Sequence, residues 1–223
     1  MLIARGLPLD SAAGEPAMAI RRMCTIMVAS PQLLIDSGAA VGLPRSKLER
    51  PLVVNRSRPA MGTLFETCLV GADEEHLSSV AEACLAEVQR LDRRLSRCHV
   101  QSEIARINRE ATRESVIVDY ELAELLKLCY TAAQQTAHWF DIASGQAWAI
   151  KNRGVEFLEL GTQLDFSSIS KGYALDRMAE LLNTNAVDDV LLQGGKSSVL
   201  ALGNQPGMEG GGWHVGVRHP LRN

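Results

Sequence analysis

The sequence predicts an α+β fold, a single sheet domain with packed amphipathic helices, and three observations lead to this prediction. Apolar residues recur at three- and four-residue steps over residues 77–95, which predicts a helix of about six turns. Alternating or β-branched segments at residues 63–70, 116–118, 190–192 and 198–202 predict strands. The first helices precede most of the strands and do not alternate with them, so this fold is favoured over regular βαβ repeats.

The expected helices have recognisable starts. Asp73 follows a glycine turn and is expected to cap the first helix, because its side-chain oxygen can accept a hydrogen bond from a free backbone N–H. A second amphipathic helix is expected to start near Tyr120, and a third to cover residues 170–182. Residues 213–217 are expected to form a late strand after a glycine-rich turn.

Composition indicates a globular protein. The apolar fraction of 46% and the charged fraction of 22% are ordinary for this class. Residues 1–50 contain several prolines and no sustained periodicity, so we expect a poorly ordered N-terminal extension followed by one domain over residues 51–223. The net charge of -3 and the aromatic fraction of 4% do not favour nucleic acid as a partner.

The sequence gives few indications of a compartment. No run of 18 apolar residues exists, so no transmembrane segment is expected. Residues 18–29 place two arginines before an apolar run, but the run is short and no clear signal peptide or lipobox follows. The 5 cysteines are scattered without a C-x-x-C pair, which favours buried thiols in a reducing compartment over disulfides or zinc. A cytoplasmic location is therefore favoured.

The most informative window is residues 164–177, L-D-F-S-S-I-S-K-G-Y-A-L-D-R. A strand end expected at residues 164–166 leads through serines into a helix, and the first N–H groups of a helix can hold a phosphate. Lys171 adds a positive charge for the same ligand. An ordinary turn with a serine cap and a solvated lysine is the alternative. The window contains neither the P-loop nor the dinucleotide-binding glycine pattern.

Residues 165–173 resemble the D-x-G-G-x-A-K-G-Y motif of the FAD:protein FMN transferases, the ApbE-type flavin transferases. Four further segments are similar to family motifs and occur in the family's order. They are A-M-G-T at residues 60–63, L-S with S-E-I and R-I-N within residues 95–108, W-F-D-I at residues 139–142, and Q-G-G at residues 193–195 with W-H-V-G-V-R at residues 213–218. Together the matches span about residues 60–220.

The resemblance implies an activity and a site. Family members bind FAD and Mg²⁺, cleave the pyrophosphate, and attach the FMN half to a threonine or serine hydroxyl of a client flavoprotein. By position, the FAD-contacting residues are Met61, Trp139, Phe140, Asp141, Asp165 and Lys171. Ser168 matches the position whose backbone carbonyl helps to hold the metal, since Mg²⁺ prefers oxygen ligands. The resemblance assigns no catalytic residue. Family members are often exported, so the resemblance does not decide between a cytoplasmic and an exported protein.

The sequence also departs from the family pattern. The motif's double glycine is Ser167-Ser168 and its alanine is Ser170, while Cys98 replaces an aromatic residue. The segment over residues 142–164 is shorter than usual. The chain ends at Asn223, before the family segments H-x-[IL]-D-P and D-A-x-x-T that supply further metal ligands. We therefore expect a C-terminally truncated transferase-like domain. The alternatives are a flavin-binding protein without catalysis, an inactive fragment, or a structural domain without a ligand.

Overall fold

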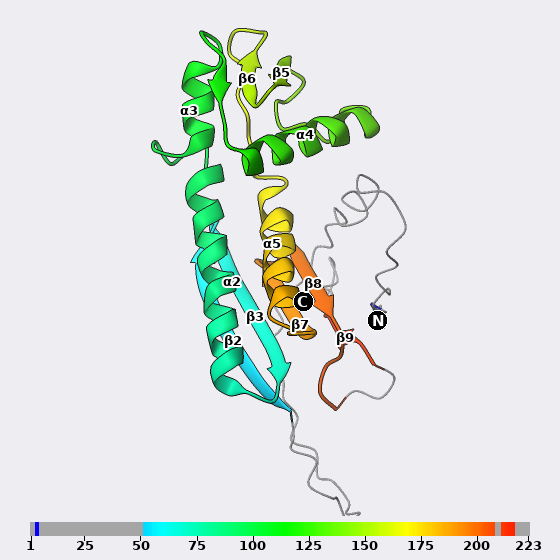
Figure 1. Cartoon of the computed structure of the whole chain (residues 1–223). Coiled ribbons are helices and arrows are strands. Elements are labelled where there is room, and N and C mark those ends of the chain that lie inside the picture. The colour runs from blue at the N-terminus through cyan, green and yellow to red at the C-terminus, as the bar shows by residue number, and fades with distance from the viewer. Residues whose placement is uncertain (1–2, 5–50, 208–210, 217–223) are drawn as a thin grey trace, which may run out of the picture. The chain divides into compact units, whose positions relative to one another are not determined.

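A computed structural model describes residues 3–4, 51–207 and 211–216 (Figure 1). The described elements, in chain order, are β1 (Ile3–Ala4), β2 (Leu52–Ala60), β3 (Thr63–Gly71), α2 (Glu74–Leu95), α3 (Glu103–Glu110), β4 (Val116–Ile117), α4 (Tyr120–Gln135), β5 (Trp148–Lys151), β6 (Gly154–Phe157), α5 (Ser170–Thr184), β7 (Asp189–Gly194), β8 (Ser198–Leu202) and β9 (Trp213–His214). The predicted α+β class is confirmed. Apart from β1, the extension expected over residues 1–50 lies outside the described residues.

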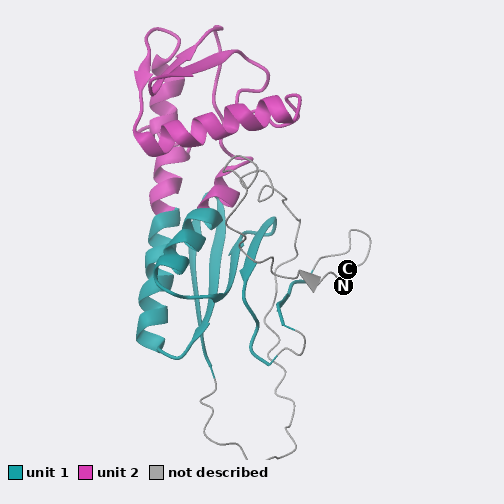
Figure 2. Ribbon diagram, turned by 45° about the vertical axis from the view of Figure 1, so that its right-hand side comes forward, with its two compact units in different colours: residues 1–9, 25–88, 175–223 teal, residues 10–24, 89–174 magenta. Residues whose placement is uncertain are grey.

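The chain divides into two compact units, which Figure 2 shows in separate colours. Of the described residues, 3–4, 51–88, 175–207 and 211–216 belong to unit 1, and residues 89–174 belong to unit 2. The division falls inside α2 and inside α5, so each of these helices contributes residues to both units.

Unit 1 is built on a four-stranded antiparallel sheet in the order β2-β3-β7-β8. Parts of α2 and α5 cover one face of this sheet (Figure 1). Arg58 of β2 lies directly opposite Phe65 of β3, and opposed residues of an antiparallel pair point to the same face of the sheet. Because the guanidinium of Arg58 binds Glu82 of α2, Phe65 also points toward the helices. By alternation along β3, Leu69 does so too, and both side chains are fully buried.

The opposite face of the unit 1 sheet has its own apolar cover. Its cluster consists of Cys68, Val70 and Trp213, with Leu191 and Ala201 packed against them. The indole Nε1 of Trp213 donates a hydrogen bond of 2.7 Å to the carbonyl of Leu202, which fixes the ring over the strands. Because β3 is covered on both faces, its sequence keeps apolar residues at consecutive positions near its end.

Unit 2 combines α3 and α4 with a three-stranded antiparallel sheet in the order β4-β6-β5. Asp119 caps α4, since its carboxylate accepts a 2.8 Å hydrogen bond from the N–H of Leu122. The rings of Tyr130 and Trp148 meet edge to face at 5.8 Å and join α4 to β5. These contacts form the scaffold on which the predicted site residues of this unit are held.

The predicted helices are confirmed. Asp73 accepts a 3.0 Å hydrogen bond from the N–H of His76 and so caps α2 as expected. The helices expected near Tyr120 and at residues 170–182 are α4 and α5. Among the described residues, no helix has the length and apolar character needed to cross a membrane. Three of the cysteines are buried and free, namely Cys68, Cys84 and Cys129.

Three expectations about strands need correction. The described strands form three antiparallel sheets and not one, because periodicity predicts strands but not which of them pair. Residues 164–166 are not a strand, since a side chain from α3 binds both backbone groups of Leu164. Of the strand expected at residues 213–217, only Trp213–His214 is extended and paired, and Val217 lies outside the described residues.

Replacing Trp213 tests the cover of the unit 1 sheet. Trp213→Ala should lower the free energy of unfolding by about 3 kcal/mol, because it removes a large side chain that is only 4% exposed. Trp139→Ala is the matched control and should change it by less than about 0.5 kcal/mol, because that indole is 94% exposed. Urea unfolding followed by far-UV circular dichroism measures the stability of both variants. Equal destabilisation would contradict the conclusion that Trp213 covers the sheet of unit 1.

Candidate functional site

The segment over residues 165–171 leads into α5 and belongs to unit 2. The carbonyl of Phe166 accepts hydrogen bonds from the N–H groups of Ile169 and Ser170, so a tight turn precedes the first residue of α5. Ser167 and Ser168 in this turn are exposed. Lys171 is half-buried in the first turn of the helix, and no hydrogen bond or ion pair engages its ammonium within the described part of the chain.

Asp165 begins this segment with an ionised carboxylate. Its Oδ1 accepts a 2.9 Å hydrogen bond from the N–H of Ser167, and its Oδ2 lies 3.4 Å from Nε of Arg97. Burial alone would raise the pKa of Asp165, but the hydrogen bonds from Ser167 and the charge of Arg97 outweigh it and lower the pKa. At neutral pH, Asp165 therefore carries a negative charge that is already partly compensated.

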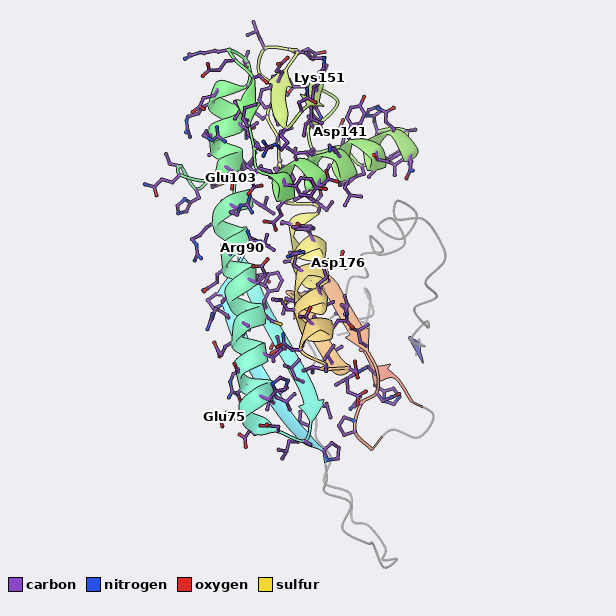
Figure 3. The ribbon with its side chains drawn as sticks, in the orientation of Figure 1. Glu75, Arg90, Glu103, Asp141, Lys151 and Asp176 are labelled. Carbon is purple, nitrogen blue, oxygen red and sulfur yellow. The ribbon has the colours of Figure 1, made fainter. Side chains whose placement is uncertain are left out.

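Two of the predicted site segments lie side by side in unit 2. The N–H of Asp165 donates a 2.8 Å hydrogen bond to the carbonyl of Ile142, which follows Asp141 directly. The Asp141 side chain, which Figure 3 labels, is 10% exposed. It accepts hydrogen bonds of 2.8 Å and 2.9 Å from the N–H groups of Ala143 and Gly145. The structure therefore brings Asp141 and Asp165 into neighbouring segments, with the Asp141 carboxylate organising its own loop.

The loop that carries Trp139 and Phe140 is strained. Ala137 and His138 have φ values of 49° and 64°, a left-handed conformation that non-glycine residues seldom adopt. Thr136 Oγ1 accepts a 3.1 Å hydrogen bond from the N–H of Phe140 and so closes the loop at the end of α4. The Trp139 indole is 94% exposed. An exposed aromatic face on a constrained loop is suited to stacking against a planar ring.

Met61 lies in unit 1, at the turn between β2 and β3. Met61 and Gly62 have φ values of 51° and 69°, and positive φ at both central positions defines a type I′ hairpin turn. Gly195 lies against this turn, because its N–H donates to the carbonyl of Leu64 and a Cβ added there would lie 2.3 Å from Oγ1 of Thr63. The segments A-M-G-T and Q-G-G thus meet at one end of the four-stranded sheet.

An ion-pair network in unit 2 has no counterpart in the sequence analysis. The Arg94 side chain is 16% exposed, and its guanidinium binds Glu121 and lies 2.6 Å from carboxylate oxygens of both Glu103 and Asp119. Arg94 lies in the last turn of α2, while its partners lie at the starts of α3 and α4 (Figure 3 labels Glu103). Charges from three elements become neighbours only after folding, so helical periodicity gives no indication of them.

Glu121 connects this network to the candidate site. Its carboxylate accepts hydrogen bonds of 2.6 Å and 2.9 Å from Arg90, labelled in Figure 3, and 3.3 Å from the hydroxyl of Tyr173 in the first turn of α5. The hydrogen bond from Arg90 is the main reason that the pKa of Glu121 falls to about 2. Burial of the carboxylate opposes this fall, and the positive charges of Arg90 and Arg94 add to it. Tyr173 lies two positions after Lys171, so the network anchors the helix turn that carries this lysine.

The described residues do not by themselves fit a resident Mg²⁺ ion. Mg²⁺ requires about six oxygen ligands in octahedral geometry. Among the described residues, no group of three or more His, Cys, Asp or Glu side chains is placed to hold a metal. The carbonyl of Ser168 offers one oxygen, while the nearby Asp165 carboxylate is engaged by Ser167 and Arg97. Ligands from beyond the described residues would be needed to complete such a site.

The fold defines the class of protein. The structure is similar to the ApbE protein of Thermotoga maritima, with a TM-score of 0.60 and 19% identity, over 69% of this chain and 60% of that one. The flavin transferase ApbE from Vibrio cholerae gives a TM-score of 0.60 at 17% identity, over 70% of this chain and 61% of its own. These likenesses establish an α+β fold of the flavin transferase type.

The sequence comparison gives the family. The profile of the ApbE family matches residues 61–157 and 148–223, so the chain belongs to the ApbE family. It is similar to the FAD:protein FMN transferase of Treponema pallidum (strain Nichols), with 25% identity in an alignment that covers 74% of this chain and 58% of that protein. The chain therefore spans less than two thirds of the length of these relatives.

The strain at Met61 predicts that its replacement stabilises unit 1. Met61→Asn should raise the free energy of unfolding by about 0.5–1 kcal/mol, because an Asn-Gly pair adopts positive φ readily at a type I′ turn. Gly195→Ala should lower it, because its Cβ would meet Thr63. Thermal and urea unfolding measure both variants, and a destabilised Met61→Asn protein would contradict the strain argument.

The lowered pKa of Glu121 predicts a pH-dependent contribution to stability. Glu121→Gln should lower the free energy of unfolding at neutral pH by about 1–2 kcal/mol, because Arg90 and Arg94 each lose one charged partner. The folded-state pKa of about 2 lies below the ordinary 4.5, so this stabilisation is present above about pH 4.5 and is lost as the pH falls toward about 2. The difference between wild type and variant should shrink over that range.

Urea unfolding at a series of pH values measures this difference. Glu124→Gln is the matched control on the same helix, because its carboxylate is exposed and, among the described residues, binds only the exposed Lys127. It should change stability little at any pH. A Glu121→Gln difference that stays constant between neutral pH and about pH 3 would contradict the assignment of the lowered pKa.

Proposed function

We propose that this chain binds FAD and, within a complete ApbE-type site, transfers the FMN half to a threonine or serine hydroxyl of a client flavoprotein. One observation carries the proposal: the turn over residues 165–171 has exposed serines, a lysine outside any ion pair of the described residues, and the loop of Asp141 beside it. Membership of the ApbE family and the similarity to the Treponema pallidum transferase support this activity.

Each predicted contact has a chemical reason. The ammonium of Lys171 and the start of α5 are suited to the negative pyrophosphate, because both present positive charge. The exposed Trp139 is suited to stack on a flavin ring, with Phe140 beside it in the same loop. Met61, Asp141 and Asp165 complete the proposed FAD contacts. The carbonyl of Ser168 is proposed as one Mg²⁺ ligand, with the remaining ligands from beyond the described residues.

The proposed transfer is a displacement at the phosphorus of the FMN half. The acceptor hydroxyl oxygen forms a bond to the FMN phosphorus, and the bond from that phosphorus to the bridging oxygen breaks. AMP leaves with the electron pair, and the hydroxyl proton passes to solvent. The protein's part in such a reaction is to position the phosphates and to stabilise their charge.

A second candidate is flavin binding without transfer. It is favoured by one observation: Ser167 and Ser168 stand in place of the family's double glycine, and their side chains narrow the approach to the phosphates. The two candidates differ in whether the client gains mass.

The test combines FAD, Mg²⁺ and a client domain with its acceptor threonine, followed by mass spectrometry of the client. We expect an FMN-sized gain, reduced at least about tenfold by Lys171→Ala because one phosphate-neutralising charge is lost. Lys151→Ala is the matched control, since Lys151 is an exposed lysine of the same unit at the end of β5 (Figure 3), and it should transfer normally.

A parallel titration of FAD fluorescence separates the outcomes. Binding that Lys171→Ala weakens, without a gain of mass on the client, would support the flavin-binding candidate and reject transfer. Absence of both binding and transfer would overturn both candidates. Transfer that Lys171→Ala leaves unchanged would reject the site over residues 165–171 while keeping the activity.

A further inference from the structure

We propose that Asn108 is a positioning residue for this flavin site: its carboxamide holds the backbone from which the turn over residues 165–171 starts. This inference rests on the proposed function, because it concerns the affinity of that site for FAD. Asn108 belongs to the R-I-N segment of the sequence, which forms part of α3. Its contacts lie entirely within unit 2.

The carboxamide of Asn108 binds both backbone groups of one residue. Its Nδ2 donates a 3.0 Å hydrogen bond to the carbonyl of Leu164, and its Oδ1 accepts a 2.8 Å hydrogen bond from the N–H of Leu164. This is the two-bond pattern that a neighbouring residue supplies in an antiparallel pair. Residues 162–166 belong to none of the described strands. The Asn108 side chain therefore supplies the two backbone hydrogen bonds that a neighbouring strand would supply in a sheet.

The position of Leu164 explains why this clamp bears on the site. Leu164 is fully buried, and the next residue, Asp165, donates its N–H to the carbonyl of Ile142 at 2.8 Å. Two consecutive residues are therefore fixed, one by a side chain of α3 and one by the loop of Asp141. The carboxylate of Asp165 then receives the N–H of Ser167, and α5 begins three residues later. Asn108 thus sets the base of the turn that carries the exposed serines.

Neither alanine nor aspartate at position 108 can satisfy both backbone groups of Leu164. Alanine removes donor and acceptor together and leaves two buried backbone groups of Leu164 without these partners. Aspartate keeps the acceptor for the N–H but places a negative oxygen against the Leu164 carbonyl. The resulting shift of the turn should weaken FAD binding, because binding depends on geometry at the scale of about 1 Å.

The test compares Asn108→Ala and Asn108→Asp with the control Gln163→Ala in the full chain. Gln163 is exposed, and its side chain makes only a long 3.4 Å contact with the Asn108 carbonyl. Fluorescence titration gives the dissociation constant for FAD, and amide hydrogen exchange reports the protection of Leu164. We expect Asn108→Ala to weaken FAD binding at least tenfold and to deprotect the Leu164 amide, while Gln163→Ala leaves both unchanged.

Asn108→Asp separates positioning from general stability. It should keep protection of the Leu164 amide, because the acceptor remains, and still weaken FAD binding. A purely structural role predicts that binding falls only in parallel with loss of exchange protection throughout unit 2, and that pattern would overturn the inference. Unchanged FAD affinity in both Asn108 variants would also overturn it, while the proposed function would stand. A wild-type chain that binds no FAD would overturn the proposed function and this inference together.

Discussion

The candidate site of unit 2 depends on one constraint: backbone N–H and C=O groups removed from water need hydrogen-bond partners, even where the chain forms neither helix nor strand. The site segments are irregular, so side chains supply these partners. Asn108 binds Leu164, Asp141 binds the N–H groups that follow it, and Thr136 binds Phe140. These polar residues therefore hold the loops in their conformation through hydrogen bonds within the chain, independently of any ligand.

Charged side chains around the candidate site of unit 2 also find their partners within the chain. Arg90, and with it Arg94, binds Glu121, which keeps this carboxylate ionised well below its ordinary pKa. Asp165 is compensated by Arg97 and by Ser167. Lys171 differs, because within the described residues no carboxylate neutralises it although it lies in the first turn of α5. A positive charge held at a helix start without an internal partner is suited to an external anion.

Much of the fold follows from local patterns, and the rest depends on contacts between distant segments. The helices could be predicted because α2, α4 and α5 repeat apolar residues with helical spacing and have a cap or a clear start. The hairpin of β5 and β6 could not, because its turn residues Asn152 and Arg153 have φ values of 48° and 65° without a glycine to indicate them. The clamp of Asn108 on Leu164 joins residues 56 positions apart, which no local pattern reveals.

Backbone strain follows from the turns of the chain and does not by itself mark a ligand site. Positive φ at Met61, and at Asn152 and Arg153, is explained by two-residue hairpin turns, and at His138 and Ala186 by the ends of α4 and α5. Strain of about 1 kcal/mol or more at such positions persists only where the surrounding structure enforces it. In unit 2 the enforcement is visible, because the N–H of His138 donates to the carbonyl of Ala133 and the N–H of Phe140 donates to Thr136 Oγ1. The exposed Trp139 between them is therefore presented on a backbone that hydrogen bonds of its own loop hold in place.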